Sequence, residues 1–292
     1  MPNEIIGRLN ELLPTLSKGH KKIAEYIIGH YDKAAFMTAS RLGNVTGVSE
    51  STVVRFAAEL GYEGYPELQK VLKEFTSNKL TTIQRMDVME DQLGDEDLLS
   101  KVMNFDMDQI RRTMESIDKD GFYKTVDALC RARSIYVIGA RSASVLARFL
   151  VFYFNLMFEN VKIIHTTSTS EMFEQILNIG ENDIMIGISF PRYSKYTIKA
   201  FRYAKENNAT VIAITDSALS PIAENADHML LARSDMACFA DSLVAPMSLI
   251  NALITAVSMK KREYVSNNYQ RLERIGEEYG LYDKTDEQES GS

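Results

Sequence analysis

Two hydroxyl-rich loops carry the side chains in this sequence that are best suited to hold a small anion. Residues 139–144 read Gly-Ala-Arg-Ser-Ala-Ser, and residues 189–194 read Ser-Phe-Pro-Arg-Tyr-Ser. Each loop follows a short apolar run and opens onto a helical pattern, so free backbone N–H groups at a helix start add to the serine hydroxyls. The candidate contacts of this predicted anion pocket are Gly139, Arg141, Ser142, Ser144, Ser189, Arg192 and Ser194.

Two further hydroxyl-bearing segments, 166–170 and 216–217, also follow apolar runs. Any one serine or threonine at such a place is explained equally well by helix capping, because its oxygen can accept a backbone N–H bond. Four such segments at successive strand ends favour one shared binding crevice over four separate caps.

A second candidate site lies in the first eighty residues, where two short helices separated by a tight turn are predicted. Thr38 can cap the first helix and Gly47 fits the turn. Ser49 can cap a second helix that runs to Leu60 before a stop at Gly61. This is the helix-turn-helix arrangement, in which the second helix enters the major groove of DNA.

The solvent-facing positions at the start of that second helix are the candidate DNA contacts, and they are Ser49, Glu50, Ser51, Thr52 and Arg55. Serine and threonine hydroxyls bond bases or phosphates, and an arginine guanidinium grips guanine or phosphate with two hydrogen bonds. The positions expected to pack inward are Val53, Val54, Phe56 and Ala57. The alternative is that the hydroxyls only cap the helix and that Arg55 is a solvated charge.

From Ser134 onward, short apolar runs alternate with longer helical patterns, as in repeated βα units. Such units build a parallel sheet covered by helices, and ligands bind at the carboxyl ends of its strands. The predicted strands are residues 134–138, 161–164, 183–188, 210–214 and 228–231.

Length and charge support a chain of two different domains. The 292 residues carry a net charge of −7, which excludes a uniformly basic DNA binder. Residues 1–80 carry +1 and the remainder −8, so the first part can approach a polyanion. We predict an all-α helix-turn-helix domain over 1–80, a linker with a bridging helix over 81–123, a Rossmann-like three-layer α/β domain over 124–265, and a helical extension with an acidic tail over 266–292.

Several classes of function are disfavoured. Counting from Gly139, a dinucleotide fingerprint requires glycine where Arg141 and Ser144 stand, so NAD binding is not expected. Two cysteines, Cys130 and Cys238, make neither a disulfide framework nor a four-ligand zinc site. No metal, cofactor or catalytic residue is expected. The absence of a signal-peptide core and of a membrane span predicts a cytoplasmic protein.

The helix expected after Ser142 is apolar around most of its circumference up to Phe158. Such a helix must be buried on several sides, within its domain or against another subunit. A homodimer or a higher homo-oligomer is therefore expected, and a dimer would supply two reading helices for a two-fold operator.

Residues 48–56 (Val-Ser-Glu-Ser-Thr-Val-Val-Arg-Phe) and 60–68 (Leu-Gly-Tyr-Glu-Gly-Tyr-Pro-Glu-Leu) closely resemble the N-terminal signature of the RpiR-type transcriptional regulators. Residues 124–262 resemble the sugar isomerase (SIS) domain, the phosphosugar-binding partner of that helical domain. The resemblance implies operator DNA and a small anionic effector, a sugar phosphate, as partners. It maps the phosphate-binding hydroxyls onto Ser142, Ser189 and Ser194.

The chain departs from the usual Ser-x-Ser-Gly-x-Thr pattern of the SIS family. Pro191 stands in place of a serine and Arg192 in place of a glycine, so one hydroxyl and one N–H donor are lost and a cation is added. We therefore predict a ligand-responsive transcription factor and keep two alternatives. One is a phosphosugar isomerase, for which Glu171, His165 and His228 would be the candidate bases, and the other is a SIS-fold scaffold without a ligand.

Overall fold

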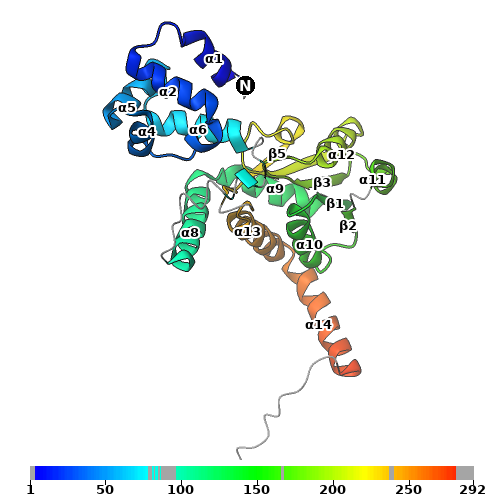
Figure 1. The fold of residues 1–292 in the computed structure, drawn as a ribbon. Helices are drawn as coiled ribbons and strands as arrows, with labels where there is room; N and C mark the ends of the chain where they lie inside the picture. The colour runs from blue at the N-terminus through cyan, green and yellow to red at the C-terminus, as the bar shows by residue number, and fades with distance from the viewer. Residues whose placement is uncertain are drawn as a thin grey trace, which may run out of the picture. The chain divides into compact units, whose positions relative to one another are not determined.

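The computed structural model describes residues 4–77, 81, 83–84, 86, 97–165, 168–236 and 240–280. The chain divides into two units (Figure 1). One comprises residues 1–106 with 235–242, and the other comprises residues 107–234 with 243–292. Predictions that concern the acidic tail, Thr166, Thr167, Cys238 and most of the segment 78–96 lie outside the described residues.

The first unit is built from helices packed around one apolar core. Large side chains that recur every three or four residues, such as Ile23, Leu42, Phe56 and Leu68, are fully buried in it. The helices before the connecting segment are α1 (Glu4–Leu12), α2 (Lys18–Gly29), α3 (Tyr31–Ala34), α4 (Ala39–Thr46), α5 (Glu50–Glu59) and α6 (Tyr65–Ser77).

Helices α4 and α5 form the predicted helix-turn-helix, and its local signals are confirmed. Thr38 Oγ1 accepts the Arg41 N–H at 3.2 Å, and Ser49 Oγ accepts the Thr52 N–H at 3.3 Å. Gly47 ends α4 in the left-handed conformation at φ 69°, which glycine adopts without steric cost. The turn is also tight on its inner side, because a Cβ on Gly43 would lie 2.8 Å from the carbonyl oxygen of Val48.

One predicted core residue of α5 is wrong. Val54 is 42% exposed, whereas Val53, Phe56 and Ala57 are fully buried. The buried positions follow the i, i+3, i+4 spacing of one helix face, and residue 54 lies one step, about 100°, around the helix from Val53. A run of two valines thus overstated the width of the buried stripe.

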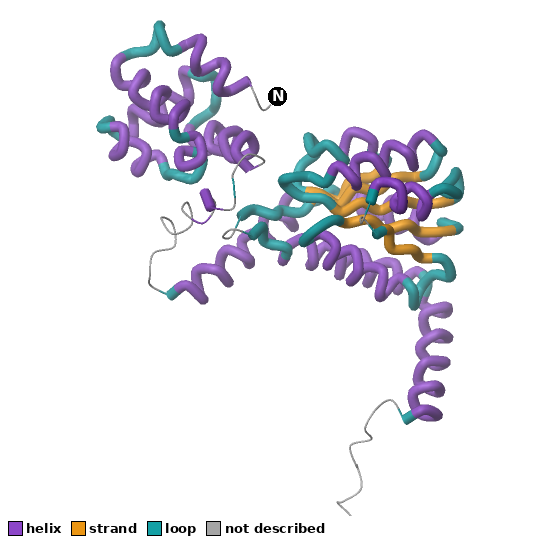
Figure 2. The backbone as a smooth tube through the Cα atoms, turned by 45° about the vertical axis from the view of Figure 1, so that its right-hand side comes forward, coloured by secondary structure: helices purple, strands orange, loops and turns teal. Residues whose placement is uncertain are grey.

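The second unit is a parallel sheet between two layers of helices (Figures 1 and 2). Its strands are β1 (Ser134–Gly139), β2 (Val161–Ile164), β3 (Asp183–Ile188), β4 (Thr210–Thr215) and β5 (His228–Leu231). Its helices include α9 (Lys119–Arg131), α10 (Ala143–Phe154), α11 (Thr169–Ile176), α12 (Lys195–Glu206), the short 3₁₀ helix η1 (Ala223–Asn225), α13 (Val244–Lys260) and α14 (Arg262–Tyr279). All five predicted strands are present.

The strand order is β2-β1-β3-β4-β5, and every pairing is parallel. Alternate residues of the strands face opposite layers, as in β1, where Val137 packs with α9, α10 and α13 while Ile138 packs with α11 and α12. The predicted three-layer α/β class is therefore confirmed. Helix α14 continues beyond α13 and extends away from the sheet (Figure 2).

A long helix, α8 (Leu98–Ser116), precedes α9 and corresponds to the predicted bridging helix. None of the helices in the described ranges is both long enough and apolar enough to cross a membrane.

Candidate functional site

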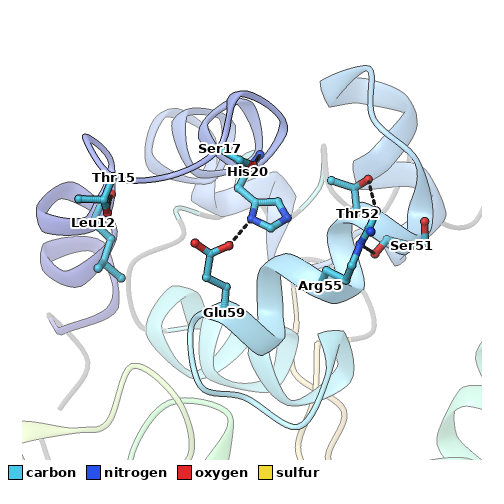
Figure 3. A network of polar contacts seen from close by, with 8 residues as sticks. All are labelled: Leu12, Thr15, Ser17, His20, Ser51, Thr52, Arg55 and Glu59. Carbon is cyan, nitrogen blue, oxygen red and sulfur yellow. Dashed lines mark hydrogen bonds and ion pairs between the residues drawn. The ribbon is translucent and has the colours of Figure 1, made fainter.

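The predicted DNA-contacting residues form one hydrogen-bonded network on the first turns of α5 (Figure 3). Ser49 Oγ lies 2.9 Å from Ser51 Oγ and 2.8 Å from Thr52 Oγ1. Arg55 lies back along the helix, where its Nε donates to the Ser51 carbonyl at 3.3 Å and a terminal nitrogen donates to Thr52 Oγ1 at 3.4 Å. Glu50 is exposed in the same turn. The network orients these side chains before any partner binds.

The far end of α5 is tied to α2 by a pair that the sequence analysis missed. Nδ1 of His20 is hydrogen-bonded to a carboxylate oxygen of Glu59, and the His20 ring packs edge-on against Phe56 with centroids 5.6 Å apart (Figure 3). This pair fixes the orientation of α5 on the core of its unit. The two residues are 39 positions apart, so no local pattern in the sequence could reveal the contact.

The candidate anion site follows from the strand order of the second unit. In a doubly wound sheet the ligand crevice lies where the order reverses, outside the carboxyl ends of two adjacent strands. Here that point falls between β1 and β3, which are paired along their whole length from Ser134 and Asp183 to Gly139 and Ile188. The loops that follow these two strands are the two loops that contain all the predicted anion contacts.

The loop after β1 turns sharply into α10. A Cβ on Gly139 would lie 2.6 Å from the Ala143 carbonyl oxygen, so glycine is required by this close approach. Arg141 has a left-handed φ of 56°, and its carbonyl accepts the Ser144 hydroxyl at 2.6 Å. Ser142 precedes the helix, and its exposed side chain makes no capping bond. Capping therefore accounts for neither serine in this loop.

The loop after β3 has the same form. The buried Ser189 Oγ accepts the Ser194 N–H at 3.2 Å, and Ser194 Oγ accepts the Thr197 N–H at 3.5 Å as the N-cap of α12. Arg192 adopts a left-handed φ of 65° beside Pro191. Each loop thus holds one arginine in a conformation that non-glycine residues rarely adopt, and such strain often accompanies binding sites.

Two features beside these loops were not among the predicted contacts. The Tyr193 hydroxyl donates to the Asp216 carboxylate at 3.0 Å, which joins the loop after β3 to the end of β4. Thr197 is fully buried, and within the described ranges its Oγ1 has no hydrogen-bond partner. An unsatisfied buried hydroxyl in the first turn of α12 is a costly arrangement that a bound polar group could relieve.

The hydroxyls outside these two loops have capping roles. Ser168 Oγ accepts the Glu171 N–H at 3.2 Å as the N-cap of α11, and Ser217 Oγ accepts the Leu219 N–H at 3.1 Å. Glu171 is an exposed residue of the first helical turn, where the helix dipole favours a carboxylate. His228 begins β5 at the opposite end of the sheet from the crevice.

Burial lowers the pKa of His228, which favours its neutral form in the folded chain. Among the described residues, no group of three or more His, Cys, Asp and Glu side chains is placed to hold a metal ion.

A helix-turn-helix unit followed by a doubly wound α/β unit is the architecture of a DNA-binding regulator with a second domain. Residues 4–79 match the model of the rpiR-family helix-turn-helix domain, and residues 128–256 match the model of the SIS domain. The chain belongs to the RpiR-type transcriptional regulators that carry a SIS domain.

Its relatives include the HTH-type transcriptional regulator HexR of Escherichia coli, which is 25% identical over 273 residues and 92% of each chain. An uncharacterised HTH-type regulator of Caldanaerobacter subterraneus is 24% identical over 88% of this chain and 92% of its own. These relatives are named as transcriptional regulators.

Two solved structures share the fold. The sugar isomerase domain of an RpiR transcription factor from Sphaerobacter thermophilus is 25% identical with a TM-score of 0.57, over 60% of this chain and 97% of its own. The Vibrio vulnificus NanR protein is 22% identical with a TM-score of 0.59, over 96% of this chain and 99% of its own.

Proposed function

We propose that this regulator reads operator DNA with α5 and senses a small anion, a sugar phosphate, in the crevice between the loops after β1 and β3. The observation that carries the proposal is the strand order, because it brings Ser142 and Ser194 from distant parts of the chain to one switch point. The N-termini of α10 and α12 open from these same loops, so their backbone N–H groups favour negative charge there.

The ligand class is supported by chemistry and by a relative. Serine hydroxyls, backbone N–H groups and an arginine in each loop suit a phosphate, while the Asp216 carboxylate at the end of β4 suits a hydroxyl-bearing ligand. The structure of Vibrio vulnificus NanR was solved in complex with ManNAc-6P. A phosphorylated sugar is therefore the class to test first.

Sensing requires that the effector binds the DNA-competent and DNA-incompetent states with different affinity. We propose that occupancy of the crevice shifts this equilibrium in a homodimer. Helix α10 supports the dimer, since it buries one face in its own unit and leaves Phe152 65% exposed on another. A two-fold particle would present two copies of α5 to adjacent major-groove half-sites.

The first test is thermal unfolding in the presence of sugar phosphates, inorganic phosphate and the parent sugars. Wild type should be stabilised by a sugar phosphate, and the Ser142→Ala/Ser194→Ala variant should lose that shift because several anion bonds disappear. Because Ser194→Ala also removes an N-cap, Asp118→Ala serves as the control: it removes the cap bond to Gly121 N–H in the same unit, and the ligand response should remain. An unchanged response in the double variant would remove this crevice as the binding site.

The second test couples the two domains. An operator duplex selected from a random pool by the protein itself is titrated at increasing effector concentration. The double variant should bind this DNA like wild type without effector and should respond only at effector concentrations higher by orders of magnitude. A response at the wild-type concentration would contradict the assignment.

A further inference from the structure

Helix α8 buries polar side chains and exposes apolar ones. Its buried residues are Gln109 and Thr113, and Thr113 Oγ1 accepts the Arg233 N–H at 2.9 Å. The exposed fractions of its large apolar side chains are 71% for Leu99, 59% for Met103, 59% for Met107 and 65% for Met114. A helix that packs only on its own domain shows the reverse pattern. The apolar side of α8 therefore needs a partner.

These exposed side chains lie on one narrow face. Leu99, Met103, Met107, the half-buried Ile110 and Met114 fall within about 80° of the helix circumference at 3.6 residues per turn. We call these five residues the α8 stripe. At 1.5 Å per residue, the stripe is about 22 Å long.

The charges of α8 lie away from the stripe and are paired with one another. Asp108 forms ion pairs with Arg111 and with Arg112, the latter at 2.6 Å. No residue of the stripe itself is charged. A face without charge is unsuited to nucleic acid, whose binding depends on contacts between cations and phosphates, and suits another apolar protein surface.

The stripe is close to symmetric about its own centre. If two copies of α8 run antiparallel with Met107 near a two-fold axis, Leu99 faces Met114 of the second copy and Met103 faces its Ile110. Each residue type then meets an apolar partner on both sides of the axis, as an isologous interface requires. The flexible methionine side chains can fill the gaps between two such helices.

We propose that the α8 stripe is a self-association surface that pairs two copies of this chain through antiparallel α8 helices. Because α8 follows the helix-turn-helix unit in the chain, this pairing joins two reading helices in one particle. The surface is distinct from the exposed face of α10. With both surfaces engaged, two isologous interfaces build a closed tetramer.

The test is sedimentation of the full chain from nanomolar to micromolar concentration. Met103→Glu/Met107→Glu places charge in the seam and should weaken one association step at least about 100-fold, which corresponds to about 2.7 kcal/mol. Asn104→Glu is the control, since it adds the same charge at an exposed position outside the stripe and should associate like wild type. Since Met103 and Met107 are exposed, circular dichroism of the monomer should remain unchanged.

A charge-pair series tests the orientation. Leu99→Glu and Met114→Lys should each weaken association, and the variant with both changes should recover it, because antiparallel pairing sets the two new charges opposite each other twice. The two positions are about 22 Å apart along one helix, so they cannot pair within a copy. Wild-type association in the Met103→Glu/Met107→Glu variant, or a wild type monomeric throughout, would overturn the proposal. Failure of the charge pair to recover association would overturn the antiparallel register.

Discussion

The backbone N–H of Ser194 donates to the buried Oγ of Ser189 at 3.2 Å, and this bond closes the loop after β3 onto the end of its strand. As the acceptor in this bond, the Ser189 hydroxyl retains its own proton as a donor. The same contact that shapes the loop thus leaves a hydrogen-bond donor at the candidate anion site.

Ser189→Ala should reduce both unit stability and ligand response. The Ser194 N–H loses its partner, which costs about 1–3 kcal/mol when the group is buried, and the anion loses one donor. Thermal unfolding with and without the stabilising sugar phosphate measures both effects. Ser189→Thr keeps the hydroxyl and should recover part of the ligand response. A full wild-type response in Ser189→Ala would place the ligand elsewhere.

Arg55→Ala should weaken binding to the selected operator. The loss should be about 1–3 kcal/mol if Arg55 contacts a base, or a reduction of the salt slope by about one if it contacts phosphate. Affinity at several salt concentrations distinguishes the two cases. Lys70→Ala removes the same charge from an exposed position on α6 and controls for net charge. If affinity and slope are both unchanged, Arg55 is not in the interface.

Gly43→Ala should destabilise the helix-turn-helix unit. The added methyl carbon would lie 2.8 Å from the Val48 carbonyl oxygen, and that contact is with backbone, so the turn itself must shift. Gly29→Ala is the matched control, because nothing lies within 4 Å of its Cβ and alanine favours a helix. Urea unfolding should show a loss in the first variant and none in the second. Equal stabilities would contradict the close approach of α4 and the turn.

Phe152→Glu should weaken self-association through α10. A charge on this exposed apolar face must be desolvated if the face is an interface. Leu219→Glu, at another exposed apolar residue of the unit, should leave association unchanged. Sedimentation of each full-length variant at micromolar concentration is the measurement. Equal association in both variants would show that the α10 face is not used.

The pair of Arg133 and Asp183 should make the second unit sensitive to acid. Burial alone raises the pKa of Asp183, but hydrogen bonds from Arg133 at 2.9 and 2.6 Å and from the Gly180 N–H outweigh it, so the pKa lies below its usual value. Because the folded pKa is the lower one, the carboxylate stabilises the fold above about pH 4 and loses this effect as pH falls further.

Melting temperatures of the second unit from pH 6 to pH 2.5 should therefore fall more steeply in wild type than in Asp183→Asn. Asp127→Asn, which removes a more exposed partner of Lys260, should follow the wild-type curve closely. Parallel curves for wild type and Asp183→Asn would show that this carboxylate does not govern the acid response.

Short-range signals in the sequence determined the elements of this protein. The caps Thr38 and Ser49 and the left-handed Gly47 act within four residues of themselves, so a linear reading suffices to place the helix-turn-helix. The five strands were equally readable, because a parallel strand buried on both faces appears as a short, nearly continuous apolar run.

Only the tertiary structure decided how these elements meet. Apolar runs do not state which strand lies beside which, so the adjacency of β1 and β3, and with it the convergence of Ser142 and Ser194, is fixed by packing. The exposure of Val54 and the inverted burial of α8 have the same origin. Hydrophobicity drives a residue out of water without naming the surface that covers it, and that surface is supplied by residues distant in the chain or in another copy.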